Sequence, residues 1–229
     1  NSGASEPAYR KAYTFWADTG NNLLKMRNSA NDGWISLRTL TGGVTTTADA
    51  TINSITVGKG ANSVAGNTVL GESALDASVS GGNNTAIGNS ALGALTSGQA
   101  NVAVGKEALK TATTPNHNTA VGHQALKATT TGGFNTASGS NTLAVNTTGQ
   151  YNDAHGYAVL TANTTGNYNS GFGYYNLGVN TTGSNNVAVG AFVLDANTTA
   201  SENTGVGYNS LGANTTGNSN VAVGAYSLD

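Results

Sequence analysis

The chain contains no cysteine and little charge of either sign. Without cysteine it forms no disulfide and no thiolate zinc site. Charged residues make up 9% of the sequence, against ~25% in an average soluble domain, and no lysine or arginine follows Lys127. Binding to nucleic acid or to an anionic membrane surface requires basic side chains, which the repeats described below largely lack. No apolar run approaches the ~20 residues needed to span a bilayer. We therefore predict no nucleic-acid partner and no membrane insertion.

The two ends of the sequence also lack familiar signals. The first five residues have neither the basic start nor the apolar core of a signal peptide, and the chain begins with Asn1 instead of methionine. The last residue, Asp229, falls in the middle of a repeat unit, whereas natural solenoids usually end in an atypical capping unit. We expect the natural polypeptide to continue beyond this point.

The dominant feature is a repeat of 17 residues that begins at Asn67 and runs without a slip to the end of the chain. Asparagine opens all ten copies, at Asn67, Asn84, Asn101, Asn118, Asn135, Asn152, Asn169, Asn186, Asn203 and Asn220. Glycine is always the fifth residue, as in Gly71 and Gly105, and leucine is always the ninth, as in Leu75 and Leu109. A strict short period predicts that every unit repeats one backbone shape and stacks on its neighbours.

Each unit has the pattern of a short strand followed by turns. The third residue is small in almost every unit, the fourth is usually apolar, and the fifth is a glycine suited to a turn with φ > 0. Leucine at position nine, with alanine or valine at position eleven, predicts a second short strand. The fixed glycine and the frequent Thr-Thr-Gly connector leave no room for a helix of ordinary length. The predicted fold is therefore all-β, a parallel β-solenoid (β-roll) of ten coils.

The small residues at position three predict a close contact between chains. Adjacent residues of a strand point to opposite faces. The apolar fourth residues are therefore expected to face the interior, and the small third residues are expected to face the backbone of another chain. The expected trimer contacts are Ala86, Ala103, Ala120, Ala137, Ala154, Ala188 and Ala222. Burying this column between three chains would also shield apolar surface that a single rod exposes.

The segments before the repeats differ from them in composition. Residues 1–40 contain both tryptophans and three short runs rich in apolar residues, separated by clusters of Asn, Asp and Gly, which predicts a small module of β-hairpins that serves as a cap or an attachment. Residues 41–66 are predicted to be a linker followed by an irregular first coil. Residues 67–229 form the repeat solenoid.

Two resemblances follow from these motifs. The segments Asn84–Gly88 and Asn101–Gly105 resemble the head repeats of trimeric autotransporter adhesins, which form a left-handed parallel β-roll with three chains side by side. The unit here is longer than is usual in those heads, and the chain shows neither a heptad stalk nor a membrane-anchoring barrel. Taken with Phe15–Thr19, Leu23–Asn28 and Asn31–Ile35, the whole chain is more similar to bacteriophage tail-fibre proteins. This resemblance implies a homotrimeric fibre of the virion that contacts other tail proteins and reaches toward a glycan or protein on the host surface.

Aromatic residues and threonines recur at fixed positions of the later coils. The aromatic candidates for a surface-binding site are Phe134, Tyr151, Tyr168, Tyr157, Tyr174 and Tyr208. Stacked rings also stabilise a solenoid or fill a chain interface, and we favour this structural interpretation over ligand binding. Paired threonines such as Thr147 and Thr148 permit an ice-binding array only if both face the same way, so turn chemistry explains them better.

The sequence gives little support for catalysis. Asp153 and His155 are expected to share one face of a strand, and such a pair can transfer a proton. No second carboxylate and no nucleophile motif accompanies them, and His117 and His123 do not have the spacing of a metal site. We predict a structural and adhesive segment of a phage tail fibre that projects a host-binding tip and is not an enzyme, with no cofactor or metal and an extracellular location on the virion. A cellular trimeric surface adhesin and an ice-binding β-solenoid remain the alternatives.

Overall fold

The computed structural model describes residues 15–18, 23–27, 34–38, 49–52 and 54–228. The chain divides into two compact units, Asn1–Ala48 and Asp49–Asp229. The first unit contains an antiparallel sheet of β1 (Phe15–Asp18), β2 (Leu23–Arg27) and β3 (Trp34–Arg38), with β2 in the centre. The small β-hairpin module predicted from the sequence is thereby confirmed. The boundary between the two units falls inside the predicted linker.

The second unit starts with an irregular antiparallel segment. Strand β4 (Ala50–Ile52) pairs with β5 (Ile55–Gly58), and β5 pairs with the first strand of the repeats. A single 3₁₀ turn (Ala61–Ser63) lies between them. Both carboxylate oxygens of Asp49 accept backbone N–H groups, from Lys59 at 2.7 Å and from Gly60 at 2.5 Å, and so hold the turn after β5. This segment corresponds to the irregular first coil expected there.

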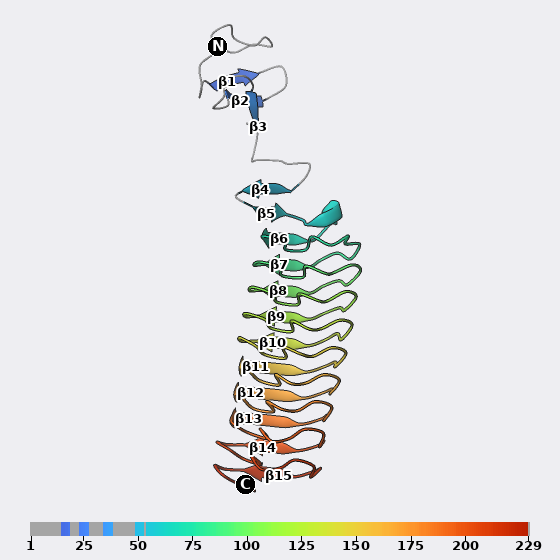
Figure 1. Cartoon of the computed structure of the whole chain (residues 1–229), viewed down its shortest axis with the longest axis vertical. Helices are drawn as coiled ribbons and strands as arrows, with labels where there is room; N and C mark the ends of the chain where they lie inside the picture. The colour runs from blue at the N-terminus through green and yellow to red at the C-terminus, as the bar shows by residue number, and fades with distance from the viewer. Residues whose placement is uncertain (1–14, 19–22, 28–33, 39–48, 53, 229) are drawn as a thin grey trace. The chain divides into compact units, whose positions relative to one another are not determined.

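The repeats form a parallel β-solenoid (Figure 1). Its ten parallel strands are β6 (Thr68–Gly71), β7 (Thr85–Ile87), β8 (Val102–Val104), β9 (Thr119–Val121), β10 (Thr136–Ser138), β11 (Asp153–Tyr157), β12 (Ser170–Tyr174), β13 (Val187–Ala191), β14 (Thr204–Val206) and β15 (Val221–Val223). Each residue pairs with the residue 17 positions later, as Ala86 does with Ala103. Within the described residues, no helix is long and apolar enough to cross a membrane.

Each coil has one strand and not two. The residues that follow the fixed glycine are turns, and the backbone of Glu107 and Leu109 lies in the left-handed region, with φ of 60° and 50°. A strand requires negative φ throughout, so the second strand predicted at positions nine to eleven is wrong. The coils nevertheless stay bonded to one another through these turns, as when Leu92 N donates to Ala108 O at 3.1 Å.

The hydrophobic core is a thin column inside the coils. Leu109 is fully buried, as are its equivalents in the coils from Leu75 to Leu194. The small residues at position three share this interior: Ala103 is 0% exposed in the single chain. A small side chain fits here because the leucine of the same narrow coil occupies much of the remaining space, and Val69 is the one larger residue at this position. A left-handed backbone costs a leucine roughly 1–2 kcal/mol, which its burial of roughly 1.5–3 kcal/mol offsets.

The fixed glycine is explained by the approach of the next coil. Gly105 has φ of 130°, a conformation that side-chain-bearing residues rarely adopt. A Cβ built on Gly105 would lie 2.5 Å from the carbonyl oxygen of Gly122 in the following coil. Both constraints recur in the coils from Gly71 to Gly207, and Gly224 of the last coil keeps the positive φ.

Candidate functional site: the outward faces of the coils

The strands turn their apolar fourth residues outward. Leu70 and Val121 are exposed, with Val121 at 40%, whereas the alanines at position three are buried in their own chain. A residue without surface in the single chain cannot contact a second chain. The assignment of trimer contacts to Ala86, Ala103, Ala120, Ala137, Ala154, Ala188 and Ala222 is therefore wrong. The alternation of faces was predicted correctly, but the interior and the exterior were exchanged.

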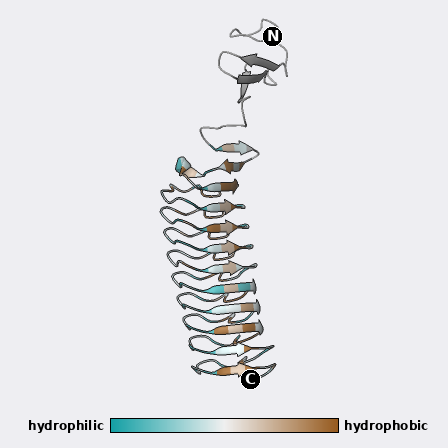
Figure 2. Cartoon of the chain, turned by 180° about the vertical axis from the view of Figure 1, so that it is seen from behind, coloured by the Kyte–Doolittle hydropathy of each residue, from teal (hydrophilic) through white to brown (hydrophobic). Residues whose placement is uncertain are grey.

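We call the outward apolar residues at positions two and four the apolar stripe. It consists of Leu70, Ile87, Val102, Val104, Val121, Phe172, Val187, Val189, Val206, Val221 and Val223. Figure 2 shows apolar residues on strands of both halves of the stack, with the clearest hydrophilic interruption at β11. Exposed apolar residues that recur on successive strands on both sides of this interruption are typical of an interaction site.

The interruption at β11 contains the two titratable residues noted in the sequence. His155 Nε2 lies 2.8 Å from Asp153 Oδ1, and both side chains are about half exposed. The imidazole also stacks on Phe172 of the next coil, with ring centroids 5.0 Å apart. The prediction that Asp153 and His155 share a face is confirmed. Their proximity permits proton exchange between them, but it does not by itself form a catalytic site.

A second set of rings forms a regular stack before the strands. His117, Phe134, Tyr151 and Tyr168, which we call the aromatic ladder, occupy the same position on four successive coils. Their centroids are 5.0, 5.1 and 5.0 Å apart, with interplanar angles of 20°, 10° and 1°. The predicted stacking of Phe134, Tyr151 and Tyr168 is confirmed. Because parallel rings cover each other's faces, the inner members of the ladder present mainly their edges to solvent.

A third set of rings follows the fixed glycine and has a different geometry. This aromatic band consists of Tyr157, Tyr174, Tyr175, Phe192, Tyr208 and Tyr226. Only Tyr157 and Tyr174 are stacked in parallel. Farther along, the ring plane of Phe192 makes angles of 71° with that of Tyr174 and 79° with that of Tyr208. The ring planes of Tyr208 and Tyr226 make an angle of 68°. Tyr157, Tyr174, Tyr208 and Tyr226 are all exposed. Part of the band was identified in the sequence, but the ring orientation that distinguishes it from the ladder was not.

The threonine pairs divide between structure and surface. At position thirteen the hydroxyl of Thr147 donates to the carbonyl oxygen of Thr164 in the next coil at 3.0 Å, and several equivalents make the same bond. Only the residue at position fourteen, such as Thr148, is exposed. A single exposed column lacks the two-dimensional array that ice binding would require, so the turn interpretation accounts better for these residues.

Two polar features occupy the early coils. Glu107 accepts from Lys110 and Lys127 at 2.9 Å each and from Gln124 at 2.9 Å. These hydrogen bonds, above all the one from Lys110, lower the pKa of the Glu107 carboxyl to about 2. This network was not recognised in the sequence, because Glu107 and Lys110 lie on one coil and Gln124 and Lys127 on the next.

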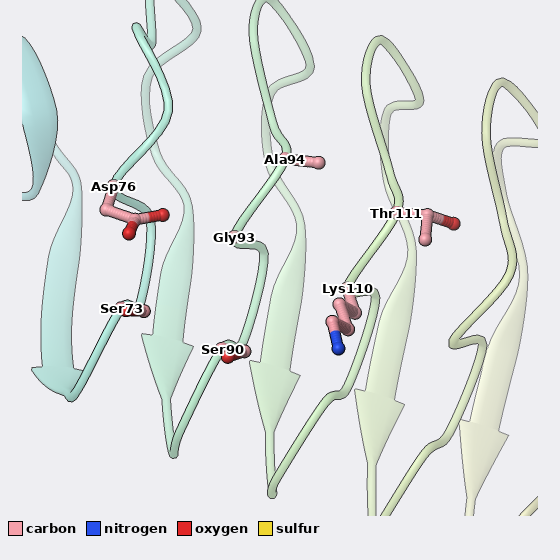
Figure 3. A pocket seen from close by; sticks show the side chains of 7 residues that line it. All are labelled: Ser73, Asp76, Ser90, Gly93, Ala94, Lys110 and Thr111. Atoms are coloured by element: carbon pink, nitrogen blue, oxygen red, sulfur yellow. The ribbon is translucent and has the colours of Figure 1, made fainter.

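An open hollow of about 340 Å³ lies beside this network (Figure 3). Its lining comes from three coils and consists of Ser73, Asp76, Ser90, Gly93, Ala94, Lys110 and Thr111. It contains no aromatic ring and only one carboxylate, and Lys110 already pairs with Glu107. We assign it no function.

Two further searches, for a metal-binding cluster among the described residues and for similar proteins, identify no additional functional site. His117 belongs to the aromatic ladder, and the described part of the chain contains no group of three or more His, Cys, Asp or Glu residues placed to hold a metal. Comparisons with protein-family models, with curated proteins and with solved structures find no match to this chain.

Proposed function

We propose that this chain is a structural and adhesive fibre segment that works as a homotrimer of parallel solenoids. The observation that carries the proposal is the apolar stripe, which follows the strands from β6 to β15. The stripe is interrupted only at β10 and β11, and a soluble monomer rarely leaves apolar surface of this extent uncovered. A partner is therefore needed along most of the length of the solenoid.

The periodicity of the stripe favours another copy of the same chain as that partner. Its apolar residues recur on the coils of β6 to β9 and again on those of β12 to β15, at the spacing of neighbouring strands, ~4.8 Å. An apolar protein surface that matches this spacing over many coils is supplied by a second solenoid with the same rise. Copies aligned in parallel satisfy this condition, and closed symmetry lets every copy bury its stripe. The number three comes from the resemblance to adhesin heads and tail fibres.

The remaining parts of the proposal follow from the resemblance to phage tail fibres. The first unit, with its sheet of β1, β2 and β3, would serve as the attachment or cap. The solenoid would hold a host-binding tip away from the virion, in contact with other tail proteins. The role is mechanical, and no catalytic step is part of it.

The test is the solution mass of the full chain by light scattering. We expect three times the chain mass of 22.8 kDa. The double variant Val121→Glu, Val189→Glu places charges in the stripe and should shift the protein to monomer, because buried unpaired charges are strongly unfavourable.

The matched control is Val145→Glu. Val145 is 42% exposed, close to the 40% of Val121, but it lies in the turn region and not on a strand. This control should keep the trimer mass. A wild-type chain that stays monomeric at all concentrations tested would refute the trimer, and equal loss in the control would refute the assignment to the stripe. Labelling of tails by an antibody against the chain, on purified particles, tests the location on the virion.

A further inference from the structure

We propose that the aromatic band is a binding surface for an extended, uncharged polysaccharide, which lies along the coils and stacks its sugar rings on the tyrosines. This inference goes beyond the fibre proposal because it makes the side of the solenoid a receptor surface in addition to a spacer. It does not depend on how many chains associate. It rests on ring geometry, on continuity along the coils and on charge.

Ring geometry separates the band from the ladder. A sugar ring binds an aromatic residue through contact with the flat face of the aromatic ring. Tyr151 is 45% exposed, but both of its faces are covered by Phe134 and Tyr168 at close to parallel angles. Tyr208 is 47% exposed and meets both of its ring neighbours at steep angles, 79° and 68°. Edge-to-face contact leaves part of the face of one ring uncovered, so Tyr208 keeps a free face that the inner rings of the ladder lack.

Continuity along the solenoid favours a chain-like ligand. The band has a member on each of five successive coils, from Tyr157 to Tyr226, and each member is in contact with the next. Adjacent coils are separated by the strand spacing of ~4.8 Å, which is comparable with the length of one hexose unit in an extended chain. The tyrosine hydroxyls can both donate and accept hydrogen bonds, as sugar hydroxyls do.

Charge favours an uncharged ligand. No lysine or arginine follows Lys127, so every coil of the band lacks a cationic side chain. The acids of these coils, including Asp153 and Glu202, would repel a polyanion. Acidic polysaccharides and nucleic acids are therefore disfavoured, and neutral glycans are not.

The experiment is native gel electrophoresis of the full chain in gels that contain a soluble polysaccharide. The neutral probes are hydroxyethyl cellulose, galactomannan and dextran, and the acidic probe is alginate. At least one neutral probe should retard the wild-type chain, and alginate should not. Tyr208→Ala and Tyr226→Ala should each raise the dissociation constant about tenfold, because each removes a ring whose contacts with its neighbours are steep. Tyr151→Ala is the matched control and should leave the dissociation constant unchanged.

Any one of four outcomes would overturn the proposal. The first is no retardation by any neutral probe, and the second is retardation by alginate as strong as by a neutral probe. The third is an equal loss of binding in Tyr151→Ala and Tyr208→Ala. Circular dichroism of each variant confirms that it is folded. Light scattering of the same samples reports the chain association separately, so a failure of the trimer and a failure of glycan binding are distinguishable. If Tyr208→Ala changes the solution mass and leaves retardation intact, the band is a contact between chains and not a glycan surface.

Discussion

The side-chain oxygen of Asn84 accepts two hydrogen bonds from Asn101 on the next coil, one from the backbone N–H at 3.0 Å and one from the side-chain amide at 3.1 Å. Asn101 also donates to the carbonyl oxygen of Pro115 at 2.8 Å, and both asparagines are fully buried. The backbone bond to the preceding asparagine recurs at every junction up to Asn220. A second ladder at position twelve links Asn146, Asn163, Asn180 and Asn197. The repeated asparagine therefore ties each coil to its neighbours inside a thin apolar core.

Replacing one asparagine of the first ladder should destabilise the solenoid. The backbone N–H of Asn135 donates a hydrogen bond to Asn118 Oδ1 at 2.8 Å. In Asn118→Ala this buried N–H would lose its partner. Loss of a buried hydrogen bond of this kind should lower the free energy of unfolding by about 1–3 kcal/mol. Urea unfolding measures this difference. Thr131→Ala, at an exposed position, is the control and should stay within about 0.5 kcal/mol of wild type. Equal effects of the two substitutions would show that the ladder is not a specific source of stability.

Gly105→Ala should be among the most damaging single substitutions in the chain. The added methyl group would meet the backbone of Gly122, and alanine would have to adopt φ of 130°. We expect a loss of more than about 3 kcal/mol, or failure to fold, because backbone strain and overpacking both contribute. Gly93→Ala is the control, since side chains stand at its equivalent in other coils, such as Lys110. Thermal melts that show similar losses for both variants would contradict this explanation of the fixed glycine.

Removal of the central tyrosine of the aromatic ladder should reduce stability without affecting glycan binding. Tyr151 stacks on two neighbours, and each aromatic pair contributes about 0.5–1.5 kcal/mol beyond the area it buries. Tyr151→Ala should therefore cost at least about 1–3 kcal/mol in urea unfolding. Gln150→Ala, at the exposed neighbouring position, should cost almost nothing. An unchanged stability in Tyr151→Ala would remove the structural role that we assign to the ladder.

The Glu107 network predicts a specific dependence of stability on pH. The folded state lowers the pKa of Glu107 from its usual 4.5 to about 2, so the carboxylate favours folding above pH 4.5. This contribution should decline as the pH falls from about 4.5 toward 2. Glu107→Gln should therefore melt at a lower temperature than wild type at neutral pH, and the difference should shrink below pH 4.5. A difference that stays constant across this range would show that ionisation of Glu107 does not contribute to stability.

The sequence predicted the architecture because the repeat is strict. Asparagine, glycine and leucine return every 17 residues, and no regular structure other than a stack of coils satisfies that period. The resulting β-solenoid, its register and the small N-terminal sheet agree with the structure. The absence of a second strand from each coil was not predictable from residue types, since leucine rarely adopts a positive φ, and Leu109 does.

The candidate sites were only partly predictable, for a reason that Val104 and Ala103 illustrate. Period two shows that these neighbours face opposite ways, but it does not show which of them faces inward. General hydrophobicity favours the valine as the buried residue, and the structure buries the alanine. The aromatic residues were visible in the sequence, but the angle between Tyr208 and Phe192 depends on how two adjacent coils pack.

The sequence by itself determined that the chain stacks identical short coils, because a strict period imposes the same backbone on every unit. It also determined that this solenoid has almost no basic surface, because composition sets charge independently of fold. Only the tertiary structure decided which face of each strand is buried, since that depends on the width of a coil whose interior already holds a leucine. It also decided which aromatic rings keep a free face, since ring orientation arises only when neighbouring coils are packed together.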